Sequence, residues 1–182
     1  MKAKITLLAI SSIIALFFSC TQKANENATT TPPTEAQIKS SKTEIAQLLD
    51  SLNAAAANAD LEKYFSYYTE DATYNGTDAT ENWNKQSFKD WAKPYFDKKT
   101  TWNFTTVKRN IYFGAHQDIA WFEELVSTQM KICRGSGVVV KQDGKWKIQQ
   151  YVLSMTIPNT QLDKVVSLKT AEEDSLLKSF KK

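Results

Sequence analysis

The sequence predicts an α+β domain in which helices cover one face of an antiparallel sheet. Apolar residues recur at helical spacing up to about residue 99, whereas residues 101–157 are rich in Thr, Val, Tyr, Phe and Trp, which favour strands. A run of strands that follows a run of helices is typical of an antiparallel sheet with its helices on one side.

Three helices are predicted before residue 99. The first is long, because its apolar stripe runs from residue 38 to the break at Asn58-Ala59-Asp60. Asp60 is suited to cap a short second helix whose apolar residues lie on one side. The third helix begins near Asn84, and Pro94 inside it removes one backbone hydrogen bond and should kink or shorten it.

Strands separated by turns make up most of the rest of the domain. They are predicted at residues 72–77, 101–113, 119–128, 132–141 and 146–157. Asp143-Gly144 is a strong signal for a two-residue hairpin turn between the last two strands. Pro158-Asn159 stops the last strand, and residues 161–182 form a tail that contains an amphipathic helix.

The last strand is apolar on both of its faces. Trp146 and Ile148 alternate toward one side, while Tyr151, Leu153 and Met155 alternate toward the other. One face can meet the helices, but no helix is left to cover the second. The pattern therefore predicts a homodimer that forms through the convex face of the sheet.

Residues 1–19 have the layout of a secretory signal peptide. Two lysines precede an apolar run at residues 5–18, which is shorter than the roughly 17–25 residues needed to span a bilayer. A small residue then precedes Cys20, an arrangement that resembles a bacterial lipobox, in which the cysteine is acylated and becomes the new N-terminus. The alternative is an ordinary secretory signal next to an incidental cysteine.

Residues 20–37 comprise the lipidated cysteine and a flexible tether rich in Thr, Asn, Ala and Pro. Such a segment cannot bury enough apolar surface to offset its ordering entropy. A membrane anchor with more than one acyl chain gives stable attachment. We therefore expect a protein of the bacterial cell envelope, attached to the membrane through Cys20 at the periplasmic or outer-membrane face.

Charge and cysteine content exclude several classes of protein. The chain has 23 Lys and Arg against 20 Asp and Glu, and loss of two lysines with the signal leaves 21 against 20, a net charge of +1. The sequence has no stripe of basic residues of the kind that binds nucleic acid, so nucleic-acid binding is not expected. With Cys20 acylated, Cys133 has no partner for a disulfide within the chain, and we expect it to be a small buried hydrophobic residue.

Four segments, taken in order, resemble one protein family. They are Gly76–Trp83, Ala120–Glu124, Arg134–Val138 and Trp146–Asn159. Together with the order of elements, they resemble the SnoaL-like branch of the nuclear transport factor 2-like superfamily over residues 38–160. The resemblance implies a cystatin-like cone, in which a strongly bent antiparallel sheet is wrapped by N-terminal helices and a pocket lies at the open end. Relatives use this pocket for isomerisation, for dehydration or for binding.

Few residues are suited to catalysis. His116 is the only histidine, and it lies in the predicted turn Gly114–Asp118, where we expect it to be exposed and away from the pocket. The scattered His, Cys and carboxylate residues form no metal-ligand cluster, and no glycine-rich phosphate loop or nucleophile elbow is present. We therefore expect no metal and no cofactor.

Glu123 is the best catalytic candidate, on a predicted strand next to that of Arg134. Trp121 shares its face of the sheet, because side chains two residues apart on a strand point the same way. If this face lines the pocket, Glu123 is a partly buried carboxylate beside aromatic rings. Three roles remain open for it: a structural ion pair with Arg134, a ligand contact, or acid–base catalysis.

Aromatic residues are the other candidates for a pocket. Trp91, Tyr95, Trp102 and Tyr74 are expected either around an apolar cavity or in the core. Asp78 and Glu81 flank the exit of the first strand beside Trp83. They are expected either to stabilise a turn or helix start, or to lie at the rim of the pocket.

Three functions follow from these observations. The first is a membrane-anchored, non-catalytic cone that binds a small apolar or aromatic molecule or serves as an accessory domain. The second is a cofactor-free isomerase or lyase acting on a small apolar substrate, with Glu123 as acid–base and Tyr74 or Arg134 polarising an oxygen. The third is a protein-interaction module whose cone is filled by its own side chains.

Overall fold

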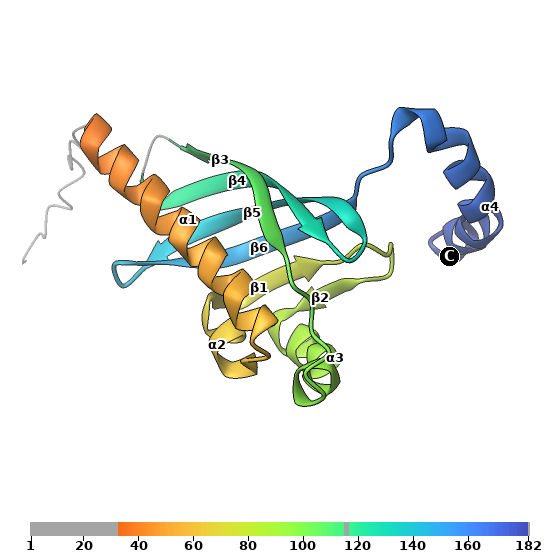
Figure 1. The fold of residues 1–182 in the computed structure, drawn as a ribbon, viewed down its shortest axis with the longest axis horizontal. Helices are drawn as coiled ribbons and strands as arrows, with labels where there is room; N and C mark the ends of the chain where they lie inside the picture. Colours follow the sequence, from red (N-terminus) through yellow and green to blue (C-terminus); the bar gives the residue numbers. More distant parts are fainter. Residues whose placement is uncertain (1–32, 115–116, 182) are drawn as a thin grey trace, which may run out of the picture. The chain divides into compact units, whose positions relative to one another are not determined.

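The order of helices and strands follows the prediction, with one additional short strand. The computed structural model describes residues 33–114 and 117–181. The elements are α1 (Glu35–Ala57), α2 (Leu61–Ser66), β1 (Tyr68–Asn75), β2 (Asn82–Asn84), α3 (Lys85–Asp97), β3 (Thr105–Phe113), β4 (Ile119–Thr128), β5 (Lys131–Gln142), β6 (Lys145–Met155), the 3-10 turn η1 (Asn159–Gln161) and α4 (Leu162–Ser179) (Figure 1). The signal segment, Cys20 and His116 lie outside the described residues.

The six strands form one sheet in the order β2-β1-β6-β5-β4-β3. The four strands β3 to β6 form an antiparallel meander, as predicted. The turn between β5 and β6 has positive φ at both Asp143 (50°) and Gly144 (76°), the geometry of the predicted two-residue hairpin. The sheet is not wholly antiparallel, because β1 pairs with β6 in parallel and joins the short β2 to its other edge.

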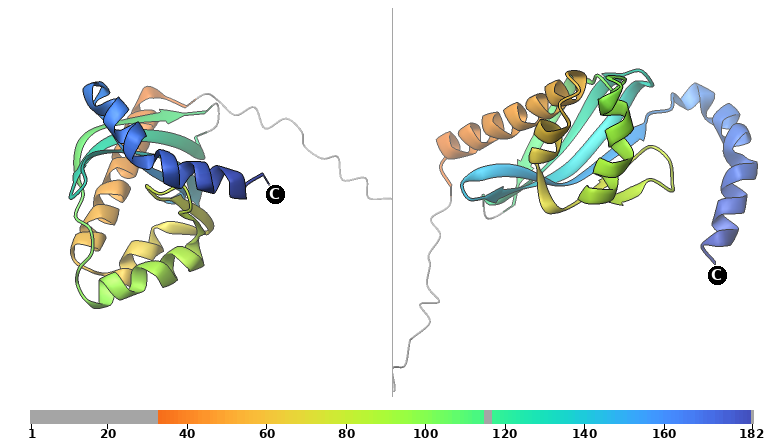
Figure 2. Two further views of the ribbon diagram at one scale, coloured as in Figure 1. Left: turned by 90° about the vertical axis from the view of Figure 1, so that its right-hand side faces the viewer. Right: turned by 90° about the horizontal axis from the view of Figure 1, so that it is seen from below.

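Bulges interrupt the sheet and help to bend it. The β3–β4 register shifts between Thr106 and Lys108, and the β5–β6 register shifts between Val138 and Val139. A bulge bends its strand and increases the local twist. In the views of Figure 2 the sheet is clearly curved, with α1, α2 and α3 on its concave side. The domain is thus a curved α+β cone.

The β5–β6 bulge also changes which side chains of β6 are buried. Ile148 pairs with Val139 and Gln150 pairs with Val138, so Gln149 is the extra residue. Beyond it the alternation is inverted, and Tyr151 and Leu153 are buried on the same inner face as Trp146 and Ile148. The assignment of Tyr151 and Leu153 to a convex dimer face is therefore wrong, since simple alternation does not hold across the bulge.

Helix α1 has a capping residue at each end. Thr34 and Gln37 form a capping box at its first turn. At the other end Asn58 is the C-cap and Ala59 takes a left-handed φ of 53°, so the helix ends where the sequence predicts. The buried side of α1 carries Ile45, Leu49 and Ala56, which join the core beneath the sheet.

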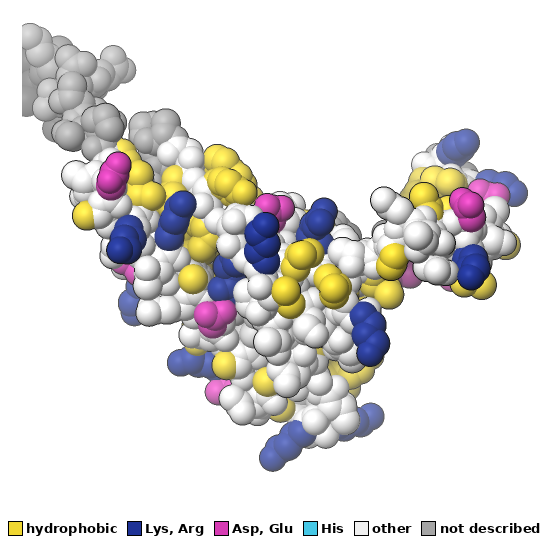
Figure 3. Space-filling model, turned by 45° about the horizontal axis from the view of Figure 1, so that its top comes forward, with side chains coloured by type: hydrophobic (Ala, Val, Ile, Leu, Met, Phe, Trp, Pro, Cys, Tyr) yellow, Lys and Arg dark blue, Asp and Glu magenta, His cyan; other side chains and the backbone are white. Residues whose placement is uncertain are grey.

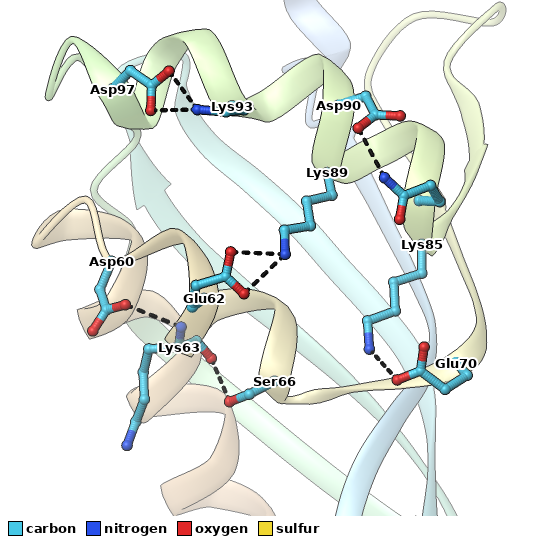
Figure 4. Close-up of polar contacts among 11 residues, drawn as sticks. Asp60, Glu62, Lys63, Ser66, Glu70, Lys85, Lys89, Asp90, Lys93 and Asp97 are labelled. Carbon is cyan, nitrogen blue, oxygen red and sulfur yellow. Dashed lines mark hydrogen bonds and ion pairs between the residues drawn. The ribbon is translucent and has the colours of Figure 1, made fainter.

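Helices α2 and α3 are fixed by caps and by surface ion pairs. Asp60 caps α2 as predicted, and Asn84, near which the third helix was predicted to begin, caps α3; each accepts a hydrogen bond from a backbone N–H in the first turn. Figure 4 shows Lys89 of α3 paired with Glu62 of α2 at 2.8 Å, and Lys85 paired with Glu70 of β1 at 2.7 Å. These exposed pairs contribute little energy individually, but they join the two helices to the first strand.

Pro94 lies inside α3 without ending it. The helix continues past Pro94 to Asp97, and its inner side places Phe88, Ala92 and Phe96 in the core. The ring of Phe88 stacks on Tyr74 of β1, with ring centroids 4.0 Å apart. This packing holds α3 against the first strand and compensates for the backbone hydrogen bond that Pro94 cannot make.

The face of the molecule shown in Figure 3 carries both signs of charge. On the face shown in Figure 3, hydrophobic side chains lie in small groups between Lys, Arg and acidic residues. No residue of α4 is buried, and Leu168 on this helix is 85% exposed. None of the helices in the described part of the chain is long and apolar enough to cross a membrane.

Candidate functional site

A cavity of about 160 Å³ lies where α3 faces the β1–β2 connection and the β4–β5 turn. We call it the aromatic cavity, because six of the side chains around it are aromatic. Its lining residues are Tyr74, Gly76, Thr77, Glu81, Trp83, Phe88, Trp91, Trp102, Phe104, Gln129, Met130 and Leu153. Trp91 is 39% exposed, so part of the lining is open to solvent.

Five of the six aromatic rings around this cavity, all except Phe104, pack against one another. Trp83 of β2 lies 4.9 Å from Trp91 and 5.6 Å from Phe88, measured between ring centroids, and both pairs are stacked. Phe88 and Trp91 share one side of α3 because they are three residues apart in a helix. Trp102 follows α3 and lies 6.2 Å from Phe88. Several large rings are therefore held in fixed positions beside the cavity.

Glu81 is the one carboxylate among the described residues that line the aromatic cavity. Gly76 makes room for it, because a Cβ at Gly76 would lie 2.0 Å from Oε2 of Glu81. The same Oε2 accepts a hydrogen bond from the backbone N–H of Asp78 at 3.2 Å. Among the described residues, no Lys or Arg forms an ion pair with Glu81.

The two acidic residues after β1 thus have different roles. Asp78 stabilises the turn, since its Oδ1 accepts hydrogen bonds from the backbone N–H and the hydroxyl of Thr80. These bonds lower the pKa of Asp78. Glu81 lies at the cavity. Burial raises the pKa of Tyr74 well above its usual range, and Tyr64 and the charge of Glu81 raise it further.

A buried polar network lies among the apolar side chains on the inner face of the meander. Arg109 of β3 donates to Glu124 of β4 through Nε at 2.8 Å and to Asp50 of α1 at 2.9 Å. The hydroxyl of Tyr151 on β6 donates to the other oxygen of Glu124 at 2.9 Å. Glu124 and Tyr151 are both almost completely buried. Both carboxylate oxygens of Glu124 therefore accept hydrogen bonds from side chains within the network.

Gly135 of β5 makes this network possible. A Cβ at this position would lie 2.3 Å from the hydroxyl oxygen of Tyr151 and 3.0 Å from Cγ of Glu124. The bare backbone therefore lets Tyr151 reach across β5 to the carboxylate on β4. Burial raises the pKa of Tyr151 well above its usual range, and the neighbouring charge of Glu124 adds to this effect.

Three of the predicted ligand-binding residues meet at the aromatic cavity. Tyr74, Trp91 and Trp102 all line it. Tyr95 lies one helical turn further along α3 and borders an adjoining depression together with Trp91 and Trp102. The helical spacing in α3 explains why the sequence identified Trp91 and Tyr95 together.

The other three predicted residues lie on the outer face of the sheet, which carries Trp121, Glu123 and Leu125 of β4. Trp121 and Glu123 do share one side, as expected, but Ala120, Phe122 and Glu124 face the core. Glu123 is exposed, so its expected burial beside pocket aromatics is wrong. It accepts hydrogen bonds from the Asn110 amide at 3.0 Å and the Tyr112 hydroxyl at 3.4 Å.

Arg134 of β5 is also exposed on this outer face. It lies opposite Leu125, whereas Glu123 lies opposite Ser136. Within residues 33–114 and 117–181, the two charged groups form no ion pair. The structural pair expected between Glu123 and Arg134 is therefore absent, and the buried pair of the sheet is Arg109 with Glu124.

Several lining residues were not selected as ligand contacts from the sequence. Phe88 lies on the inner side of α3, and Phe104, Met130 and Leu153 come from other parts of the chain. No local pattern connects residues so far apart in the chain. The sequence does indicate that Glu124 could face the core, because Phe122 and Val126, two positions to either side, are apolar. Trp121 and Leu125 flank Glu123 in the same way, so the pattern does not distinguish the two carboxylates.

Metal-ligand clusters are absent from the described residues. Cys133 is a free, buried cysteine in this part of the chain, in agreement with its expected role as a small core residue. The candidate site therefore consists of aromatic rings, one carboxylate and neutral polar groups. Such a lining can enclose an apolar ligand and orient one polar or charged group on it.

The curved sheet with helices on its concave side and a small aromatic cavity defines a domain of the cone class shared by nuclear transport factor 2-like and cystatin-like folds. The family model for the SnoaL-like domain matches residues 45–158, and the chain belongs to this family. No curated protein matches the chain.

Solved structures share this fold at low sequence identity. A protein of unknown function from Pseudomonas putida, described as NTF2-like, is 15% identical with a TM-score of 0.57, covering 66% of this chain and 90% of its own. A Caulobacter vibrioides protein with a cystatin-like fold is 9% identical with a TM-score of 0.58, covering 71% and 99%. A putative scytalone dehydratase from Novosphingobium aromaticivorans is 13% identical with a TM-score of 0.55, covering 66% and 87%.

Proposed function

We propose that this protein binds a small apolar or aromatic molecule in the aromatic cavity and that it is a non-catalytic, membrane-anchored binding protein. The observation that carries this proposal is the set of six aromatic side chains around a cavity of about 160 Å³. A dry cavity of about 150 Å³ in another protein binds benzene, so this volume is sufficient for one ring or a compact aliphatic group.

The distribution of ionisable groups favours binding over catalysis. General acid–base catalysis needs a titratable group within hydrogen-bond reach of the substrate. Glu123, the best catalytic candidate from the sequence, lies on the outer face, and Glu124 and Arg109 are engaged with each other. An isomerase or lyase would have to rely on Glu81 instead. A fully filled cone is also a poor description, because the space beside α3 is open.

Replacing Trp91 by alanine should weaken the binding of a one-ring probe such as phenol about tenfold. Trp91 is a wall of the cavity, and the loss of an aromatic contact costs about 0.5–1.5 kcal/mol beyond the buried area. Ligand-detected NMR on the full-length chain measures this affinity. Trp121→Ala is the matched control, because Trp121 is similarly exposed but lies on the outer face. Equal effects of both substitutions, or no binding of phenol at all, would contradict the proposal.

The membrane anchor is a separate part of the proposal. Replacing Cys20 by serine should move the protein from the membrane pellet to the soluble fraction, because an attachment by two or more acyl chains would be lost. Fractionation of the native host followed by immunoblotting measures this shift. Cys133→Ser removes the other cysteine and should leave the protein in the membrane pellet. An unchanged distribution of the Cys20 variant would exclude lipid anchoring at this residue.

A further inference from the structure

The charge at the aromatic cavity narrows the class of ligand. Its described lining contains one carboxylate, Glu81, and no Lys, Arg or His. The other polar groups on lining side chains are neutral: the hydroxyls of Tyr74 and Thr77, the amide of Gln129 and the indole N–H groups of the three tryptophans. The negative charge of Glu81 therefore has no countercharge in the lining, and an anionic ligand would be repelled from this site.

The aromatic rings add to the negative electrostatic potential that Glu81 creates in the cavity. The face of an aromatic ring carries partial negative charge, and cations within about 6 Å of a ring centroid are attracted to it. Trp83, Trp91 and Trp102 surround the cavity, and tryptophan is the most effective of the aromatic residues for this interaction. The three rings form one cluster: the centroid of Trp91 lies 4.9 Å from that of Trp83 and 6.3 Å from that of Trp102.

The position of Glu81 is determined by its surroundings. Gly76 leaves the space that its carboxylate occupies, and the backbone N–H of Asp78 holds one carboxylate oxygen. Glu81 and Tyr74 line the same cavity, so the charge of Glu81 acts on its inner wall. A fixed carboxylate beside several tryptophan rings suits a quaternary or tertiary ammonium group, because aromatic rings and a carboxylate both attract a cation.

We propose that the ligand of the aromatic cavity is a small organic cation, with an alkylated ammonium group held between the tryptophan rings and Glu81. This inference rests on the proposed binding function and adds the charge of the ligand to it. The alkyl groups of such a cation suit an apolar wall, and its diffuse positive charge is less costly to desolvate than that of a primary amine.

The test compares choline with 3,3-dimethylbutan-1-ol, which has the same shape but carries a carbon atom in place of the charged nitrogen. Calorimetric titration of the full-length chain should give about tenfold tighter binding of choline, because the cation alone gains from the rings and the carboxylate. Glu81→Gln should reduce this preference to threefold or less. Glu123→Gln, a matched change on the outer face, should leave the tenfold preference intact.

Further measurements distinguish a failure of the cation proposal from a failure of the proposed binding function. Added salt should weaken choline binding and leave binding of the alcohol unchanged, which tests the role of charge without any substitution. Circular dichroism of the Glu81 variant establishes that it is folded. Equal affinity for both probes, with both bound about tenfold more weakly by Trp91→Ala, would overturn the cation proposal while the apolar binding function stands. Failure of both probes and of phenol to bind would overturn both.

Discussion

Replacing Glu124 by alanine should lower the free energy of unfolding by about 3–5 kcal/mol, the usual cost of breaking a buried ion pair from one side. The substitution would leave Arg109, whose side chain is 8% exposed, without its buried counterion, and the Tyr151 hydroxyl without its acceptor. Asp50 would still pair with Arg109, but it lies near the surface, with a side chain 63% exposed. Urea denaturation followed by circular dichroism measures the change.

The adjacent residue provides the control for this prediction. Glu123 has the same side chain on the same strand but points to the outer face, where its hydrogen bonds are exposed to water. Glu123→Ala should therefore change the free energy of unfolding by less than about 0.5 kcal/mol. If the two substitutions had equal effects, the assignment of Glu124 to the inner face and Glu123 to the outer face would be incorrect.

Replacing Gly137 by alanine should destabilise the fold by about 3 kcal/mol, at the upper end of what overpacking usually costs. A Cβ at Gly137 would lie 2.1 Å from the backbone oxygen of Gln150 and 2.9 Å from the ring of Phe122. A backbone atom cannot rotate away as a flexible side chain can, so β5 and β6 would have to separate next to their bulge.

Thermal unfolding of the Gly137 variant should be compared with that of Gly114→Ala. A Cβ at Gly114 would have no atom of the described residues within 4 Å apart from its own chain neighbours, so this variant should keep the stability of the wild type or gain up to about 1 kcal/mol through the unfolded state. A Gly137 variant as stable as the Gly114 variant would show that the contact between β5 and β6 is looser than described.

Local signals in the sequence predicted most of the elements. Strand β4 spans the predicted residues 119–128, and the turn at Asp143-Gly144 has the expected backbone geometry. Periodicity and turn chemistry act over a few residues, so they can be read directly. The parallel pairing of β1 with β6 joins residues more than 70 positions apart, and the bulge at Gln149 has no sequence signature. These two features depend on the assembled sheet.

Only part of the candidate site could be predicted, because local patterns identify residues close together in the chain but not residues that the tertiary fold brings together. Trp91 and Tyr95 follow from helical spacing, whereas Phe104 and Leu153 reach the aromatic cavity only through the tertiary fold. The choice between Glu123 and Glu124 required the absolute orientation of β4. Both residues have apolar neighbours two positions away, so alternation alone could not determine which carboxylate faces the core.

The place of β6 in the sheet sets the order in which the chain can fold. β6 lies between β1 and β5, so the first strand has no partner on that side until the last strand is available. Much of the core therefore forms through contacts between distant residues, which are slow to establish. The parallel pairing of β1 with β6 can therefore form only once the chain is available up to residue 155, so the sheet is completed by the last strand to be synthesised.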